Sequence, residues 1–108
     1  AGALGDRSVR VSSPDAKVKR VYVVSGAGGD HESLAYARRG ADALITGEVK
    51  HHVFVEADEQ DFPIVEFSHY YSEILCCDVL KGAIKSSFGD LRVIEAHRRC
   101  PYKTLEEV

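Results

Sequence analysis

The order of sequence patterns predicts an α/β fold, with a mostly parallel sheet of about four strands and three helices. Short apolar, β-branched segments alternate with helix-like segments along most of the chain, and glycines or turn residues separate them. This alternation is typical of strand–helix–strand units, in which consecutive strands run parallel. The 108 residues correspond to one domain, with an irregular lead-in over 1–16 and a tail over 98–108.

Five segments have the composition of strands. The strongest is KRVYVVSG at 19–26, because β-branched and aromatic residues are followed there by a glycine. The others are SVRVSS at 8–13, ADALITG at 41–47, FPIVEFS at 62–68 and DLRVIEAH at 90–97.

Three segments are predicted to be helices, at 29–40, 51–60 and 69–87. Asp30 is placed to cap the first of them. The last is the longest, and one of its faces carries the apolar side chains Ile74, Cys77, Leu80 and Ile84. We therefore expect Cys76 and Cys77 to belong to a buried helix face rather than to a reactive thiol site.

Composition and charge exclude several classes of protein. A net charge of −3 argues against binding to a nucleic-acid backbone, and no apolar run approaches the length that spans a bilayer. The chain opens without a signal-peptide pattern, and its three cysteines are too few and too close together for a disulfide framework. A cytoplasmic location is the expectation from these features.

Polar residues gather where three predicted strands end, and the segment FSHYYSEIL at 67–75 is the most informative of these ends. His69 and Glu73 are four residues apart, so a helix would place both side chains on one face. An imidazole and a carboxylate in that arrangement suit a divalent ion such as Zn, Fe, Mn or Ni. The alternative is that Ser68 caps a helix and the His–Glu pair only stabilises its first turn.

The other two strand ends contain weaker signals. In TGEVKHH, Glu48 and His51 are three residues apart and His52 follows, although surface or capping histidines would look the same. SGAGGD follows a strand and precedes a helix, so it could present backbone N–H groups to a phosphate. It lacks the third glycine of a dinucleotide-binding loop, and a tight strand-to-helix turn is the favoured explanation.

These three segments occur together, and in this order, in a known family. RRGADALITGEVKHH and PIVEFSHYYSE resemble motifs in the carboxyl-terminal half of the NIF-three-like proteins, also known as dinuclear metal centre proteins or GTP cyclohydrolase type 2 homologues. The resemblance runs from about Lys17 to about Ala96. It departs from the family pattern at Ser68, where a glycine is usual. Because the remaining family ligands come from an amino-terminal half, we expect the chain to be a fragment or a reduced form.

The resemblance implies a site and a function. His69 and Glu73 match metal ligands, while His52, and with it Glu48, match residues expected to transfer protons or orient ligands. The loop with Ser25, Gly26 and Gly28 would hold part of a substrate. The implied function is a metal-dependent, hydrolase-like protein in which a divalent ion activates water to attack a small, perhaps nucleotide, substrate. The alternative is a non-catalytic interaction module with a protein partner.

Two further expectations accompany this interpretation. A homo-oligomer is expected, because a sheet taken from a larger assembly exposes an edge or an apolar face. Metal binding by His69 and Glu73 alone should be weak and should fade below about pH 6, since the reference pKa of histidine is about 6.5.

Overall fold

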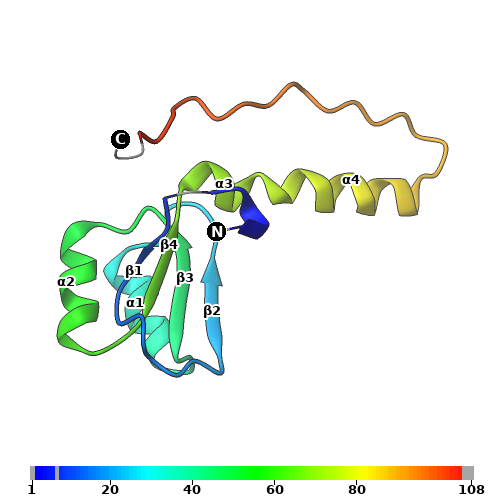
Figure 1. The fold of residues 1–108 in the computed structure, drawn as a ribbon. Coiled ribbons are helices and arrows are strands. Elements are labelled where there is room, and N and C mark those ends of the chain that lie inside the picture. The colour runs from blue at the N-terminus through cyan, green and yellow to red at the C-terminus, as the bar shows by residue number, and fades with distance from the viewer. Residues whose placement is uncertain (1, 7, 106–108) are drawn as a thin grey trace.

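The computed structural model, which describes residues 2–6 and 8–105, contains a four-stranded sheet with helices on one face and at one end (Figure 1). The strands lie in the order β1-β4-β3-β2. Strands β2, β3 and β4 are parallel to one another, and β1 pairs antiparallel with β4. The predicted α/β class and the mostly parallel sheet are therefore confirmed. The strand bounds are β1 (Arg10–Val11), β2 (Val21–Val24), β3 (Ala43–Gly47) and β4 (Ile64–Phe67).

All three predicted helical segments are helical. Asp30 is the N-cap of the first helix, where its side chain accepts a hydrogen bond of 2.8 Å from the backbone N–H of Ser33, as predicted. The third segment is divided at Ile74 into a short helix and a long one. The helix bounds are α1 (His31–Arg38), α2 (His51–Glu59), α3 (His69–Glu73) and α4 (Leu75–Ser87), and a short 3-10 helix η1 (Gly2–Leu4) precedes them.

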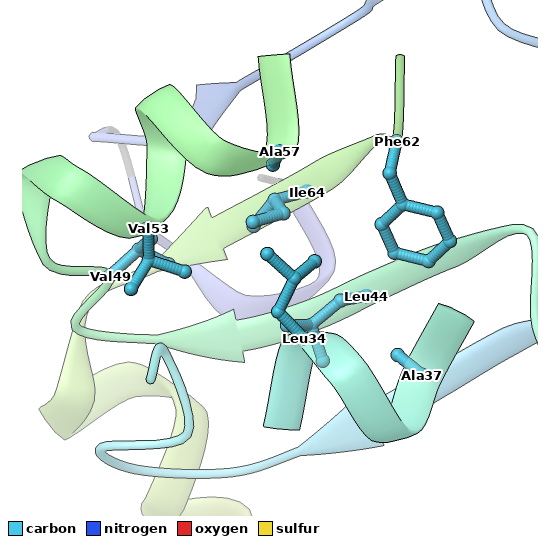
Figure 2. Close-up of a cluster of buried hydrophobic side chains, with 8 residues drawn as sticks. All are labelled: Leu34, Ala37, Leu44, Val49, Val53, Ala57, Phe62 and Ile64. Atoms are coloured by element: carbon cyan, nitrogen blue, oxygen red, sulfur yellow. The ribbon is translucent and has the colours of Figure 1, made fainter. Parts of the chain in front are cut away.

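The hydrophobic core lies between the sheet and the helices α1 and α2 (Figure 2). Leu44 of β3 and Ile64 of β4 are register partners that face the helices, and both are fully buried. Helix α1 contributes Leu34 to this layer and α2 contributes Val53, since these positions lie on the inner faces of amphipathic helices. The rest of the cluster consists of Ala37, Val49, Ala57 and Phe62.

This architecture brings the three polar strand ends to one edge of the sheet. Strands β2, β3 and β4 are parallel, so their carboxyl ends meet, as ligand sites in such sheets require. Helix α3 begins directly after β4 and contacts β3. None of the helices within residues 2–6 and 8–105 is long and apolar enough to cross a membrane.

The prediction of a strand at 90–97 is wrong. These residues form no strand, and the segment instead runs back beside α4 (Figure 1). Side-chain contacts hold it there: Lys81 pairs with Glu95, and Arg98 donates to the backbone oxygen of Ile74 at 3.1 Å. Apolar alternation supplies a strand only where a neighbour offers backbone partners. The segment lies beside α4 and along neither edge strand of the sheet, β1 or β2 (Figure 1). The end of the predicted tail, 106–108, lies outside the described residues, as do positions 1 and 7 of the lead-in.

The predicted burial of the cysteines is also wrong. Cys76 is exposed and Cys77 is half-buried, and no residue of α4 is fully buried. Leu80, on the face expected to enter the core, is 59% exposed. The helix extends away from the sheet, and the 90–97 segment runs alongside it (Figure 1).

The sheet face opposite α1 and α2 carries a row of β-branched side chains. The strand register aligns Val11, Val65, Ile45 and Val23 across all four strands. Val11 is 47% exposed and Val23 is 62% exposed, while Ile45 and Val65 are half-buried. Sheets with mainly parallel strands are usually covered on both faces. Here the exposures of Val11 and Val23 show that the row is an exposed apolar surface.

We expect this apolar row to mediate self-association, because a row of similar side chains can pack against its own copy across a twofold axis. Val23→Glu should shift the chain toward a monomer in sedimentation velocity experiments, since each copy would bring a charge into the contact. Val55→Glu is the matched control, because Val55 is 44% exposed but lies on α2. A parent chain that stays monomeric at high concentration would contradict the expectation.

Candidate functional site

His69 lies between two carboxylates at the carboxyl edge of the sheet. Its Nε2 atom is 3.1 Å from Oε1 of Glu73, one turn along the same helical segment, and its Nδ1 atom is 3.2 Å from Oε2 of Glu48. Glu48 follows β3, and His69 opens α3 after β4. The three side chains are 38% to 60% exposed, so the site is open to solvent. The structure therefore brings together three of the residues singled out in the sequence.

Two glycines make this close approach possible. Gly26 has φ of +72°, and a Cβ built on it would lie 2.2 Å from Oε1 of Glu73 and 3.4 Å from Nε2 of His69. A Cβ on Gly47 would lie 2.5 Å from the backbone oxygen of Gly26 and 3.2 Å from the Cα of His69. The first glycine thus lets the Glu73 carboxylate lie directly against the backbone, and the second lets α3 pack on the end of β3.

Ser72 joins α3 to the glycine loop, the turn at 25–29 between β2 and α1. Its hydroxyl accepts a hydrogen bond of 2.9 Å from the backbone N–H of Gly26 and donates one of 2.8 Å to the backbone oxygen of His69. Our sequence reasoning assigned no role to Ser72, although it stands in the S-E pair that ends the SHYYSE motif. The hydroxyl explains why that position suits a serine.

The start of α3 is held by a residue from the lead-in. The backbone N–H of Ser68 donates to Oδ2 of Asp6 at 2.6 Å, and Asp6 is only 3% exposed. Burial alone would raise the pKa of Asp6, but hydrogen bonds from Ser68 and Ser8 outweigh it and lower that pKa. Ser68 is the N-cap of α3 by backbone conformation, yet its hydroxyl makes no capping hydrogen bond. Sequence reasoning missed Asp6, which lies in a segment without a periodic pattern.

The two carboxylates raise the pKa of His69. The hydrogen bond with Glu48 is the largest cause, and the negative charge of Glu73 adds to it, while partial burial opposes both. A carboxylate lies at each ring nitrogen, 3.2 Å from Nδ1 for Glu48 and 3.1 Å from Nε2 for Glu73, so in the neutral ring either one can accept the single proton. The tautomer that donates from Nδ1 to Glu48 is the one that leaves Nε2 available as a metal ligand.

The other predicted site residues lie farther from this pair. His51 and His52 begin α2 and are both exposed. Among the described contacts of His69, neither histidine appears. Ser25 is exposed beside Gly26, whereas a Cβ on Gly28 would lie 2.4 Å from Cγ1 of Val24, so close packing accounts for that glycine.

The pair His69 and Glu73 has the spacing of two metal ligands. Ligand atoms about 2.0–2.2 Å from one ion, at tetrahedral or octahedral angles, lie about 3.0–3.5 Å apart. The 3.1 Å between Nε2 and Oε1 falls in this range, and both side chains are partly open to solvent. In the part of the chain that the structure describes, no group of three or more His, Cys, Asp or Glu side chains is arranged to hold an ion. Glu48 faces the other ring nitrogen, Nδ1, so His69 and Glu73 are the two ligands that this site could offer to an ion.

A pocket of about 530 Å³ adjoins the pair. Its lining includes His69, Glu48 and the backbone around Gly29, together with Lys50 from the start of α2. On its wall lie two further charged residues that sequence reasoning did not single out, Arg10 and Glu66. The pocket could admit a small polar molecule next to the His–Glu pair.

Comparison with known proteins gives a consistent result. The family model for Duf34/NIF3 (NGG1p interacting factor 3) matches residues 1–101. A GTP cyclohydrolase 1 type 2 homolog from Pyrococcus horikoshii is 40% identical over 73 residues, which cover 68% of this chain and 28% of that protein. A protein of the same name from Staphylococcus aureus is 31% identical over 87 residues, which cover 80% of this chain and 23% of that protein.

Solved structures agree on the fold. The Bacillus cereus protein related to NIF3 matches with a TM-score of 0.75 and 23% identity, over 96% of this chain and 30% of that one. The chain spans roughly a quarter of the curated relatives that it matches, 28% of one and 23% of the other. The resemblance seen in the sequence is confirmed: the chain belongs to the Duf34/NIF3 family.

Proposed function

We propose that His69 and Glu73 are two ligands of a divalent metal centre in a hydrolase-like protein that acts on a small-molecule substrate. The observation that supports the proposal is the 3.1 Å separation of Nε2 and Oε1 at the solvent-open carboxyl edge of the sheet. A divalent ion bound there supplies Lewis acidity and makes a water nucleophilic near neutral pH. Imidazole with carboxylate suits Zn, Fe, Mn or Ni. The cyclohydrolase name of the relatives supports the hydrolase-like reaction.

The residues of this chain have separate tasks in the proposal. Glu48 accepts the Nδ1 proton of His69, which orients the ring and keeps Nε2 available as a ligand. The pocket lined by Glu48 and Lys50 holds the substrate next to His69, and Ala27 and Gly29, which follow Ser25 and Gly26 in the loop, border it. His52 is proposed as a proton-transfer residue on the family resemblance alone.

Calorimetric titration of the chain with Zn²⁺ and Mn²⁺ tests the proposal through its pH dependence. We expect weak binding, because two ligands are fewer than stable sites use. Binding should weaken as pH falls through the raised pKa of His69, since the protonated ring has no free lone pair at Nε2. The loss therefore begins at higher pH than the reference value of about 6.5 would give. Glu48→Gln should move the midpoint toward lower pH, because it removes the largest cause of the raised pKa.

Folding stability should depend on pH in the opposite direction. The contribution of the His69–Glu48 contact is fully present below the unfolded-state pKa of about 6.5 and is lost as pH rises through the raised folded-state pKa. Thermal melts of the metal-free chain at the same pH values separate this effect from binding. A binding midpoint that Glu48→Gln leaves in place would contradict the proposed role of Glu48.

A non-catalytic interaction module is the second candidate function. The exposed row that contains Val11 and Val23 favours it, because large apolar surfaces mark contacts with other proteins. A chain that binds neither Zn²⁺ nor Mn²⁺ but self-associates through that row would support the module.

A further inference from the structure

Glu48 holds a backbone conformation that few residues adopt. Its φ is +50°, in the left-handed region that favours glycine, yet its carboxylate is the partner of Nδ1 of His69. Non-glycine residues stay in this region only when the surrounding structure fixes them, and such residues gather at functional sites. The question is which contacts fix Glu48.

Val49, the next residue, is held on both sides of its backbone. Its N–H donates to Oε2 of Glu66 at 2.8 Å, and its carbonyl oxygen accepts from Nη2 of Arg10 at 3.3 Å. A third contact comes from the glycine loop, because Gly29 and Val49 form a parallel bridge. With both of its backbone groups bound, Val49 cannot turn, and the peptide that joins it to Glu48 is fixed.

Arg10 and Glu66 form a pair that the sheet itself builds. They are register partners across β1 and β4, and the guanidinium meets the carboxylate with two hydrogen bonds, one of 2.9 Å from Nε to Oε1 and a second from Nη2 to Oε2. The side chain of Glu66 is 10% exposed, and the Arg10 guanidinium also lies 5.1 Å from the centre of the Phe54 ring. A buried carboxylate needs a partner with fixed geometry, which the planar guanidinium supplies.

We propose that Arg10 and Glu66 are positioning residues for the His69 site. They hold Val49, Val49 fixes the left-handed conformation of Glu48, and Glu48 fixes the ring of His69. Neither Arg10 nor Glu66 contacts the ring in this scheme, so they act through the 48–49 peptide. The inference rests on the proposed function only in treating His69 as a metal ligand, and its test needs no metal.

The test is NMR of the full chain, uniformly labelled with ¹⁵N, at a pH where His69 is neutral. In the parent, the imidazole signals of His69 should show a tautomer ratio set by Glu48 at Nδ1 and Glu73 at Nε2. In Arg10→Lys and Glu66→Gln, we expect this ratio to shift toward the tautomer with its proton on Nε2, because Glu48 no longer stays at Nδ1 while Glu73 remains at Nε2. The backbone amide of Val49 should exchange about tenfold faster or more in Glu66→Gln, since its acceptor is weakened.

Arg20→Lys is the matched control. Arg20 also donates to a backbone oxygen, that of Gly40 at 3.0 Å, but it lies at the opposite end of β2. This substitution should leave the His69 signals unchanged. Arg10→Lys keeps a positive charge beside Glu66, so it decides the question if Glu66→Gln does not fold.

The outcomes separate the two proposals. A His69 signal that is unchanged in the folded variants overturns the positioning role, whatever the chain binds. A shift toward the tautomer protonated on Nε2 in Arg10→Lys, absent from Arg20→Lys, supports it. If Arg10→Lys shows this shift but the parent chain binds no Zn²⁺ by calorimetry, the metal proposal fails while the positioning role stands.

Discussion

Glu73→Gln is expected to abolish the calorimetric binding of Zn²⁺ and Mn²⁺, and His69→Ala is expected to do the same. Each change removes one of only two ligands, and a neutral amide oxygen is a much weaker donor than a carboxylate. The free energy of unfolding should change little, because substitutions at exposed positions rarely alter it. The two side chains are 52% and 38% exposed, at the wet end of the sheet.

His52→Ala is the control for this experiment. His52 is exposed at the start of α2 and is proposed to transfer protons rather than to bind the ion, so metal binding should be preserved. If Glu73→Gln binds Zn²⁺ as well as the parent chain does, then His69 and Glu73 form only a stabilising pair at the start of α3.

The largest expected change in stability comes from Gly29→Ala. A Cβ at this position would lie 2.3 Å from the Cα of Val49 and 2.5 Å from the backbone oxygen of Glu48. Both obstacles are backbone atoms, so no side-chain rotation can relieve the overlap. We expect a loss of about 2–3 kcal/mol, as overpacking typically costs. That loss corresponds to a fall of roughly 10 °C or more in Tm for a chain of this size.

Gly40→Ala is the matched control, since nothing lies within 4 Å of a Cβ built there. Differential scanning calorimetry should show a Tm near that of the parent for Gly40→Ala and a clear fall for Gly29→Ala. Equal Tm values for the two variants would mean that the β2–α1 loop and the 48–49 peptide do not pack as closely as described. Because this contact adjoins Glu48, Gly29→Ala should also broaden the NMR signals of His69.

Local signals in the sequence predicted most of the sheet and the central pair of the site. Alternating strand and helix patterns are enough to place three parallel strands, because a parallel connection requires a crossover helix. The cap at Asp30 and the four-residue spacing of His69 and Glu73 are equally local. Residues close in sequence determine these features, so a reader of the sequence can find them.

The errors concern contacts between distant segments. The 90–97 segment has the alternation of a strand, yet whether it pairs depends on which edge of the sheet is free. Burial of Cys77 depends on the direction of α4 relative to the sheet. The hydrophobic periodicity of a helix identifies its apolar face but not the element that covers that face. Likewise, Arg10 and Glu66 become partners only through the register of β1 with β4, and SVRVSS gives no sign of that partner.

That register also has a consequence for how the chain folds. Val21 pairs with Ala43 and Leu44 with Ile64, so the parallel strands form through short chain closures. Arg10 and Glu66 are separated by 56 positions. Closing so long a loop costs more conformational entropy than the shorter closures between the parallel strands. We therefore expect β1 to dock last, after a βαβαβ nucleus has formed. In stopped-flow refolding, Arg10→Lys should then speed unfolding and leave the folding rate nearly unchanged.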